Sequence, residues 1–439
     1  MSPKDKAIRI IEQLRDQGYE AYLAGGCVRD MLIGKAPQDY DITTSATPEE
    51  IVKLFAKTIP VGAQFGVVLV LFEGQPFEVA TFRHDGPYKD GRRPVHVRYG
   101  SLEEDILRRD FTINGMIYDP ISNEIIDRVG GRMDLESKLV RAIGDPRSRF
   151  EEDRLRMVRA VRFAASLGFI LESATLDAIR ELAPSIKQIS WERNGEEITR
   201  ILTEGGAQAG FELLDRTGLL KALLPEIEAL KGVAQSPEYH PEGDVFTHTM
   251  ITLSHLAAPT ETLAYGCLLH DVAKPVCMRR DEDRLTFYGH TEKGAEMAEE
   301  VLKRLKRSRA TWERVAYLVR NHLRHIQAPQ MRLSTLKRFL AEDGIDELLE
   351  LTRIDALSAN GDLKHYLFCK NKLAELKQEE IHPEPILRGR DLIAMGLSPG
   401  PNFHEILKRV EDAQLGGELS NRKEAMDWVE KHYASEVKR

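Results

Sequence analysis

The sequence predicts a mixed α/β unit over residues 1–145, followed by a chain that is almost entirely helical. Three observations support this fold class. Short alternating or apolar strand patterns are concentrated before residue 145. A long helical pattern, EEDRLRMVRAVRFAASLG (151–168), begins just after Gly144-Asp145-Pro146. No comparable run of strand patterns follows it, up to residue 439.

Each element of the first unit has a local cause. Residues 4–17 should form an amphipathic helix that Gly18 ends, and Thr47 with Pro48 should begin another. A helical turn or two is expected at VRDMLIG (28–34). The strand patterns predict a mixed sheet that leans towards antiparallel, with a hairpin in its last two strands: YEAYLAGG (19–26), DYDITT (39–44), GVVLVLFEG (66–74) and FEVATFR (77–83).

The helical remainder has only weak internal boundaries, and no repeat or low-complexity linker is present. Prolines near 184, 237–243 and 381–391 interrupt helical patterns. These breaks suggest four segments in all: residues 1–145, 146–225, 226–375 and 376–439.

The composition excludes several classes of protein. Hydrophobic residues make up 42% of the 439 residues, so global disorder is excluded. The net charge of −8 argues against a small basic nucleic-acid module, but not against an enzyme with one basic groove. No long apolar span or signal-peptide core is found, and the four cysteines form no short pair. We expect a soluble, cytoplasmic, reduced protein with no membrane partner; the oligomeric state cannot be predicted.

Two aspartates in DYDITT are the strongest catalytic candidates. Asp39 and Asp41 are two residues apart, so on a strand they would share one face and could hold divalent cations for phosphoryl transfer. Gly25 and Gly26 upstream would let backbone amides approach a triphosphate, and Arg29 could neutralise its charge. A bare D-x-D is usually a surface strand end, but these neighbours favour the catalytic interpretation. Glu78, on a second strand, is a third carboxylate candidate.

Four motifs together resemble those of the family of class II tRNA nucleotidyltransferases and bacterial poly(A) polymerases. They are GGCVRD (25–30), DYDITT (39–44), RRDFTING (108–115) and EDRLRMVRAVRF (152–163). The resemblance covers residues 20–210 and extends more loosely to GRDLIAMGLSPGPNFHEIL (389–407). It implies a polymerase-beta-like head, a neck, a helical body and a tail for the four segments. It also implies two Mg²⁺ ions on Asp39 and Asp41. Residues implied to contact the nucleotide are Gly25, Gly26, Arg29, Arg108, Asp110, Asn114, Asp153, Arg156 and Arg159.

Asp153 and Arg156 also have a chemical logic of their own. An aspartate accepts from an exocyclic amine, while an arginine donates to the adjacent ring acceptor, and cytosine and adenine both offer that pattern. Guanine and uracil instead present an exocyclic acceptor and a ring N–H, so both contacts would be mismatched. The alternative is a purely structural role, in which Asp153 and Arg156 form an i, i+3 ion pair in the first turn of the 151–168 helix. The resemblance favours base recognition, with Glu192 and Arg193 of SWERNGEEITRIL (190–202) bracing this helix.

Two charged segments complete the expected substrate contacts. Residues 84–97, HDGPYKDGRRPVHV, contain two Gly and two Pro and should form a mobile loop, with a solvated hairpin as the alternative. The resemblance implies that such a loop is needed for adding A, so deletion of 86–94 should suppress ATP incorporation and spare CTP incorporation. KRLKRSR (303–309) could contact tRNA phosphates or be a solvated helix face.

The helical part carries a second set of metal-ligand residues. A His-Asp doublet with flanking histidines and a distal aspartate suits a divalent metal such as Mn, Ni, Mg or Fe. Four segments resemble parts of an HD phosphohydrolase domain: VFTHT (245–249), LLHDVAKP (268–275), YGHTEKG (288–294) and RIDAL (353–357). In such a domain Lys274 could contact a phosphate. The predicted ligands are His248, His270, Asp271, His290, His322 and Asp355.

The favoured hypothesis is a template-independent, Mg²⁺-dependent transferase that adds CCA to tRNA 3′ ends from CTP and ATP. An A-adding tRNA enzyme or a poly(A) polymerase shares every motif named above and stays open. A third hypothesis is an HD phosphohydrolase with a relic head. The intact D-x-D and E-D-x-x-R motifs count against it, because a degenerate head should have lost one of them.

Overall fold

The computed structural model describes residues 1–62, 66–85, 97–238, 240–281, 284–376 and 384–433. The chain divides into two compact units. The first comprises Met1–Ala229 with Lys303–Arg307, and the second comprises Leu230–Leu302 with Ser308–Arg439. The border between the two units, after Ala229, lies near the border expected at residues 225–226. The finer division into four segments stays a prediction. None of the helices in the described part of the chain is long and apolar enough to cross a membrane.

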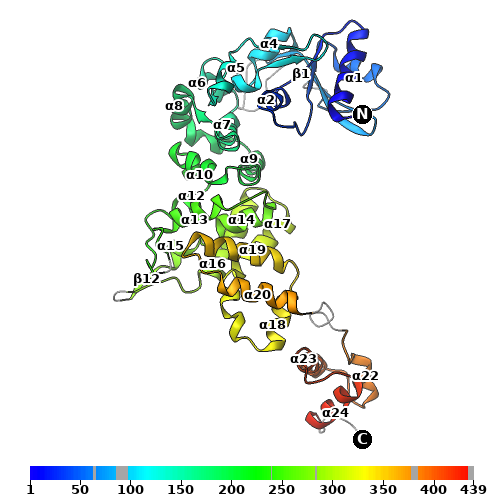
Figure 1. Ribbon diagram of the computed structural model, residues 1–439, viewed down its shortest axis with the longest axis vertical. Coiled ribbons are helices and arrows are strands. Elements are labelled where there is room, and N and C mark those ends of the chain that lie inside the picture. Colours follow the sequence, from blue (N-terminus) through cyan, green and yellow to red (C-terminus); the bar gives the residue numbers. More distant parts are fainter. Residues whose placement is uncertain (63–65, 86–96, 239, 282–283, 377–383, 434–439) are drawn as a thin grey trace. The chain divides into compact units, whose positions relative to one another are not determined.

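The first unit begins with the mixed sheet, drawn in blue and cyan in Figure 1. Seven strands lie in the order β3-β4-β5-β2-β1-β8-β9, and every pair is antiparallel except β2 with β5. The predicted mixed, antiparallel-leaning sheet is therefore confirmed. Its strands are β1 (Ala21–Ala24), β2 (Ile42–Thr44), β3 (Thr58–Gly62), β4 (Val67–Phe72), β5 (Gln75–Thr81), β8 (Ile117–Asp119) and β9 (Glu124–Ile126).

Capping residues in the sequence start the helices around this sheet. Ser2 and Thr47 each form a capping box, with Asp5 and Glu50 respectively, and proline follows each cap. The hairpin turn is Glu73-Gly74, both with positive φ, so Gln75 and Pro76, which lie between the two expected strand patterns, already belong to β5. The helices are α1 (Pro3–Asp16), α2 (Gly26–Leu32), α3 (Pro48–Leu54), α4 (Leu102–Leu107), the 3-10 helix η2 (Thr112–Asn114) and α5 (Gly131–Glu136).

The expected mobile loop lies largely outside the described residues. Its described ends form the pair β6 (Arg83–Asp85) and β7 (Val97–Tyr99), with Arg83 opposite Tyr99. Residues 86–96 are not described.

The rest of the first unit is helical. Asp145 caps α6, and its Oδ2 accepts from Ser148 N at 2.8 Å, with Pro146 as the first helical residue. Gly168 ends α7 in the left-handed conformation, as expected. The elements are α6 (Pro146–Glu152), α7 (Leu155–Leu167), α8 (Ser173–Leu182), η3 (Ala183–Gln188), α9 (Trp191–Thr203), α10 (Ala207–Arg216), α11 (Leu219–Leu223) and α12 (Pro225–Glu228), with the short parallel pair β10 (Leu139–Val140) and β11 (Ile170–Leu171).

One expectation about these helices is wrong. The pattern over 151–168 is not a single helix, because α6 ends at Glu152 and α7 begins at Leu155. Asp153 adopts an extended conformation, and its Oδ1 accepts from the backbone N–H of Leu155 at 3.1 Å. This side chain therefore competes with the helical backbone and interrupts it.

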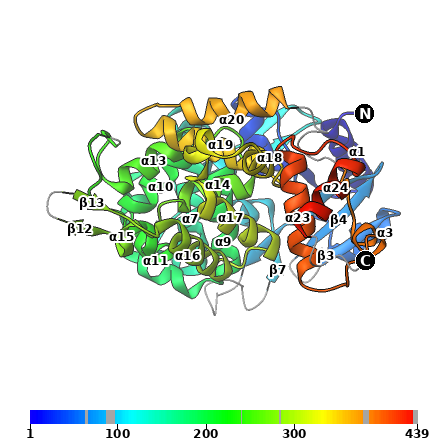
Figure 2. The same ribbon diagram turned by 90° about the horizontal axis from the view of Figure 1, so that it is seen from below.

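The second unit is a helical bundle with one small hairpin. In its centre α14 packs against α17 and α19, and α13 packs against α14 and α19 (Figures 1 and 2). Its elements are α13 (Val245–Ser254), α14 (Glu261–Leu269), α15 (Lys274–Cys277), β12 (Arg279–Asp281), β13 (Arg284–Thr286), α16 (His290–Arg304), α17 (Arg309–Asn321), η4 (Arg324–Gln330), α18 (Leu333–Leu340), α19 (Ile345–Ser358), α20 (Lys364–Glu375), α22 (Gly389–Ala394), α23 (Asn402–Leu415) and α24 (Arg422–His432).

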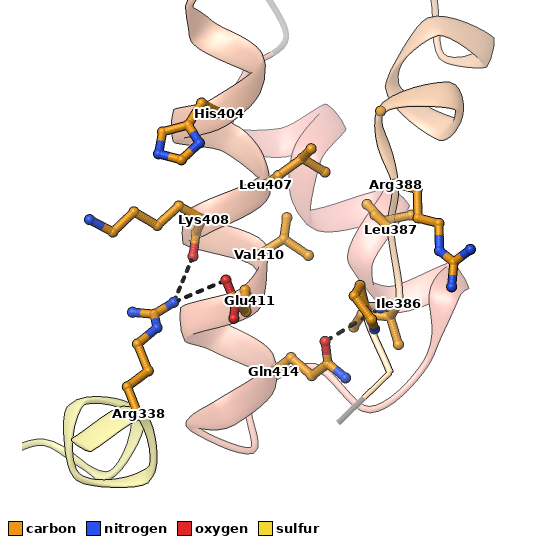
Figure 3. Close-up of a pocket in the computed structure, with 12 residues that line it drawn as sticks. Arg338, Ile386, Leu387, Arg388, His404, Leu407, Lys408, Val410, Glu411 and Gln414 are labelled. Carbon is orange, nitrogen blue, oxygen red and sulfur yellow. Dashed lines mark hydrogen bonds and ion pairs between the residues drawn. The ribbon is translucent and has the colours of Figure 1, made fainter. Parts of the chain in front are cut away.

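The C-terminal helices have a small core of their own, which includes Leu392, Ile406 and Val429. Arg338 of α18 reaches α23, where its Nη2 lies 3.4 Å from Glu411 Oε2 (Figure 3). The same guanidinium group also pairs with Asp412. A cavity of about 680 Å³ lies beside this contact. None of the residues that the sequence singles out for catalysis or metal binding lines it.

Candidate functional site

The predicted head and neck residues converge on one cavity. It has a volume of about 910 Å³ and contains every candidate that the sequence places before residue 160: Gly25, Gly26, Arg29, Asp39, Asp41, Glu78, Arg108, Asp110, Asn114, Asp153, Arg156 and Arg159. Among them, Glu78 lies on β5, Gly26 and Arg29 lie on α2, Asn114 lies on η2, and Arg156 and Arg159 lie on α7, whereas the others lie in the segments between the helices and strands. Sequence motifs that are up to 134 positions apart (25 to 159) therefore share one surface.

The carboxylates occupy one part of this cavity. Asp39 is exposed, Asp41 is partly buried, and both precede β2, which begins only at Ile42. The expected placement of both aspartates on the strand is therefore wrong. The backbone hydrogen bonding between β1 and β2 still extends to Asp41, because the backbone oxygen of Asp41 accepts from Ala24 N at 3.0 Å.

Electrostatics couples the three acidic side chains. Burial, followed by the nearby charges of Asp39 and Glu78, raises the pKa of Asp41 to about 7, although Arg109 opposes the shift. Oxygen atoms of these three residues do not all lie within 4.8 Å of one another, as judged from the described side chains. The donor set nevertheless suits Mg²⁺, which takes one or two protein carboxylates and completes its ligands with water and substrate phosphates.

Gly25 keeps the space next to these carboxylates open. It has a φ of +79°, and a Cβ there would lie 3.3 Å from Arg109 Nη1 and 3.7 Å from Asp41 Oδ2. A side chain at this position would be strained and would fill the cavity beside Asp41. Arg29, by contrast, is buried and held by protein groups: its Nε donates to Asp30 at 2.8 Å and its Nη1 to Asn114 at 2.8 Å.

Two arginines are fixed by a residue that the sequence analysis missed. Asp105 is fully buried and accepts from Arg108 Nη2 at 2.6 Å and from Arg109 Nη2 at 2.9 Å. Burial alone would raise the pKa of Asp105, but these two guanidinium groups lower it. The acidic run Glu103-Glu104-Asp105 three residues before the arginines is the signal that could have revealed it.

A second ion pair joins the segment before η2 to α7. Arg159 donates to Asp110 Oδ2 through Nε at 2.9 Å and Nη2 at 2.7 Å. Burial opposes ionisation of Asp110, but the charge of Arg159 outweighs it and lowers the pKa of this carboxyl. Asn114 Nδ2 donates to the same aspartate at 3.3 Å, so Asp110, Asn114 and Arg159 form one network at the cavity wall.

Asp153 and Arg156 line the same cavity, but their side chains do not pair with each other. Arg156 donates to Glu152 at 2.7 Å and to the backbone oxygen of Arg149 at 3.0 Å. Asp153 accepts instead from Arg193 Nη2 at 2.8 Å. The alternative of an i, i+3 ion pair is not observed, because the helix breaks at Asp153. Of the two residues expected to brace this helix, Arg193 contacts Asp153.

The cavity also contains basic residues that the sequence analysis did not select. Lys35, Arg162 and Arg200 line it, together with Phe163. Arg162 is nearly fully buried and donates to Glu197 at 2.7 Å and to Glu204 at 3.0 Å. The repeated arginines of RMVRAVRF, three residues apart, put several guanidinium groups on related faces of α7.

The basic run 303–309 is partly structural. Arg304 forms an ion pair with Glu226 at 2.6 Å and lies over the ring of Trp191. Arg309 pairs with Glu313 at 2.8 Å. These contacts weaken the phosphate-binding interpretation for at least two of the five basic residues.

In the second unit, all six predicted HD residues come together. Ligand atoms of His248, His270 and Asp271 lie within 4.8 Å of one another, and so do those of Asp271, His290 and His322. Asp355 joins the first group, since its Oδ1 lies 3.0 Å from His248 Nε2. A cavity of about 440 Å³ opens beside Asp271, His290, His322 and Asp355.

The local chemistry of this cluster suits a metal ion. His248 Nε2 lies 3.3 Å from His270 Nε2, which is 3.2 Å from Asp271 Oδ2. Ligands bound about 2.1 Å from one ion lie about 3.0–3.4 Å apart at the usual angles, so these separations match a coordination sphere. His290 Nε2 is buried without a hydrogen-bond partner among the described residues. Lys274, which could contact a phosphate, pairs with Asp271 at 2.7 Å, donates to Gln235 and lines the adjacent cavity.

Two further residues of this cluster were missed by the sequence analysis. Glu242 Oε1 lies 2.7 Å from His248 Nδ1 and 2.9 Å from His240 Nδ1. Both belong to PEYHPEG (237–243), which was interpreted only as a boundary. No spacing rule links this segment to the HD motif, so the sequence contained no clear signal for it.

Comparison with known protein families matches three successive regions of the chain. Residues 21–141 match the family model of the poly A polymerase head domain. Residues 168–231 match a probable RNA and SrmB-binding site of polymerase A, and residues 245–360 match the HD domain. The three matched regions follow one another in the order predicted from the motifs.

Individual relatives extend the similarity over the chain. The CCA-adding enzyme of Geobacillus kaustophilus (strain HTA426) is 47% identical over 236 residues, an alignment that covers 53% of this chain and 58% of the relative. The CCA-adding enzyme of Geobacillus sp. (strain WCH70) is 32% identical over 430 residues, 97% of this chain and 96% of the relative. The crystal structure of the Bacillus stearothermophilus CCA-adding enzyme in complex with CTP has a TM-score of 0.77 at 29% identity, and covers 99% of this chain and 98% of its own.

Proposed function

Because the chain belongs to the family of CCA-adding enzymes, we propose that it is a template-independent nucleotidyltransferase that adds CCA to tRNA 3′ ends from CTP and ATP. The observation that carries this proposal is the single cavity in which three carboxylates, several arginines and the pair Asp153 and Arg156 meet. Such a cavity offers contacts for a triphosphate, a base and the end of an RNA chain. An A-adding or poly(A)-adding enzyme is the alternative.

The acidic part of the cavity is the proposed reaction centre. The family and the HD domain imply dependence on a divalent metal ion. We propose that Asp39 and Asp41 hold Mg²⁺, with Glu78 as a third carboxylate. Bound there, Mg²⁺ supplies charge stabilisation for the attacking 3′ oxygen and the leaving pyrophosphate. Arg109, held by Asp105 and close to Asp41, places a positive charge at the same point.

The neck residues are the proposed base-recognition site. Each partner is held separately, Asp153 by Arg193 and Arg156 by Glu152 and by backbone oxygens. In the proposed complex, Asp153 accepts from the exocyclic amine and Arg156 donates to the ring acceptor of C or A. Asp153 is thus held from α9, and Arg156 from α6.

Arg156→Ala should weaken the use of CTP and ATP together, whereas Asp153→Ala should relax discrimination against UTP and GTP. A good pair of such contacts contributes roughly 1–3 kcal/mol, so about tenfold effects or more are expected. Single-nucleotide incorporation with each of the four triphosphates measures both effects. Arg180→Ala, an exposed neck residue outside the cavity, is the matched control. Full selectivity in Asp153→Ala would place base choice elsewhere.

The function itself is tested with three tRNA substrates, ending in the discriminator base, in C and in CC, each supplied with CTP or ATP alone. CCA addition predicts CTP incorporation on the first two and ATP incorporation only on the third. If no end ever accepts CTP, the A-adding alternative replaces the proposal. If neither nucleotide is incorporated while the second unit hydrolyses phosphate ends, the relic-head hypothesis is correct.

The convergence of six metal-ligand residues favours a second activity. We propose that the HD cluster holds a divalent ion, one of Mn, Ni, Mg or Fe, and hydrolyses phosphate monoester or 2′,3′-cyclic phosphate ends. Bound there, the ion activates water for attack on phosphorus. The adjacent cavity of about 440 Å³ provides room for a phosphorylated ribose.

A further inference from the structure

The four predicted histidine ligands of the HD cluster, His248, His270, His290 and His322, are oriented in two different ways. Three of them use Nδ1 to bond to the backbone oxygen three residues earlier: His270 to Cys267 at 2.9 Å, His290 to Phe287 at 2.8 Å and His322 to Val319 at 2.7 Å. A neutral imidazole that donates from Nδ1 has its lone pair on Nε2. These three rings are therefore fixed with Nε2 available for the proposed ion.

His248 cannot use the same arrangement. His270 and His322 directly follow the last residues of α14 and α17, where backbone oxygens lack a helical partner. His248 lies within α13, and the oxygen three residues earlier, that of Val245, accepts from Thr249 Oγ1. The only acceptor at its Nδ1 among the described residues is the carboxylate of Glu242, at 2.7 Å.

Glu242 lies in a position from which its carboxylate can accept a hydrogen bond from His248 Nδ1. Its side chain is almost fully buried, and Oε1 contacts both His248 and His240. Its other oxygen, Oε2, is buried without a hydrogen-bond partner in the described part of the chain. Metal-binding histidines usually donate their second ring N–H to a carboxylate or carbonyl, and this partner raises the basicity of the ligand and fixes its orientation.

We propose that Glu242 is a positioning residue of the metal centre, which holds His248 in the tautomer that offers Nε2 to the ion. The proposal rests on the proposed hydrolytic function of the HD cluster. It adds a carboxylate from outside the HD motif, on which one of the four histidines depends. His270, His290 and His322 are independent of it, because backbone oxygens orient them.

The test is a Mn²⁺ titration of the full-length chain, followed by electron paramagnetic resonance. Asp39→Asn and Asp41→Asn are present throughout, so that the head contributes little binding. Glu242→Ala should weaken Mn²⁺ affinity by about 10–100-fold. Glu242→Gln, which keeps an oxygen acceptor for Nδ1–H, should recover most of that loss. Glu238→Ala removes an exposed carboxylate from the same segment and should leave the affinity unchanged.

The melting temperature of the metal-free chain separates positioning from a purely structural role. The proposal predicts that the Ala and Gln variants melt alike without metal and differ with it. Wild-type Mn²⁺ affinity in Glu242→Ala would overturn the proposal and leave the hydrolytic function intact. Equal losses in Ala and Gln, together with a lowered metal-free melting temperature, would also overturn it. If the chain with native Glu242 binds no Mn²⁺, the proposed HD function itself fails.

Discussion

Asp39→Asn and Asp41→Asn should each reduce nucleotide incorporation on the order of 10³-fold. The substitutions keep the shape of the side chains and remove the charge that stabilises the transition state, and loss of one such group commonly costs 10²–10³-fold. Incorporation of labelled ATP into tRNA ending in CC, with tRNA binding measured in parallel, checks this. Glu49→Gln, on the exposed face of α3, removes an acidic charge outside the cavity and is the matched control. Near-normal turnover in both aspartate variants would contradict the metal assignment.

The environment of Asp41 predicts a pH signature in the metal-free protein. Its pKa rises from the ordinary 3.8 to about 7 in the folded state, mainly through burial and the charges of Asp39 and Glu78. The folded chain therefore binds more protons than the unfolded chain between these values. Stability from this group is present below about pH 4 and is lost as the pH rises through 7.

Asp41→Asn should remove this component of the pH dependence, and Mg²⁺ should reduce it in the wild type. Melting temperatures between pH 5 and 8, with and without Mg²⁺, would measure both effects. An unchanged pH profile in the variant would show that Asp41 titrates at its ordinary value.

A double substitution, His270→Ala with Asp271→Ala, should remove the bound metal from the second unit and abolish hydrolysis of phosphate ends. Asp271 belongs to two of the three-residue groups, one with His248 and His270 and the other with His290 and His322, so its loss affects both of these groups at once. Metal analysis of the purified chain and release of phosphate from a 2′,3′-cyclic end are the two measurements. Nucleotide incorporation should persist, because none of the cluster residues lines the cavity of the first unit.

His404→Ala, in the tail, removes an exposed histidine away from the cluster and should change neither measurement. Because both substituted residues are buried, Asp355→Asn is a milder second variant with the same expected direction. Equal metal content in the wild type and the double variant would refute the HD site. Metal without hydrolysis would leave it structural.

The sequence by itself determined the features that depend on local chemistry. The amphipathic pattern of residues 4–17 and the capping Thr47 indicate helices, and alternating apolar residues define the strands, so the mixed sheet and the helical remainder could be predicted. The motifs around Asp39, Asp153 and His270 carry their chemistry within a few residues. Their presence in one chain was enough to predict two sites.

Only the tertiary structure decided how those residues are held. Asp153 leaves the helical pattern because it caps Leu155 and bonds to Arg193, which lies 40 residues later. Glu242 reaches His248, and Asp105 secures two arginines. Periodicity describes which face of an element is apolar, but a buried charge or ring nitrogen must find a partner in space. That partner is chosen by packing, and so the orientation of each site could not be deduced from spacing along the chain.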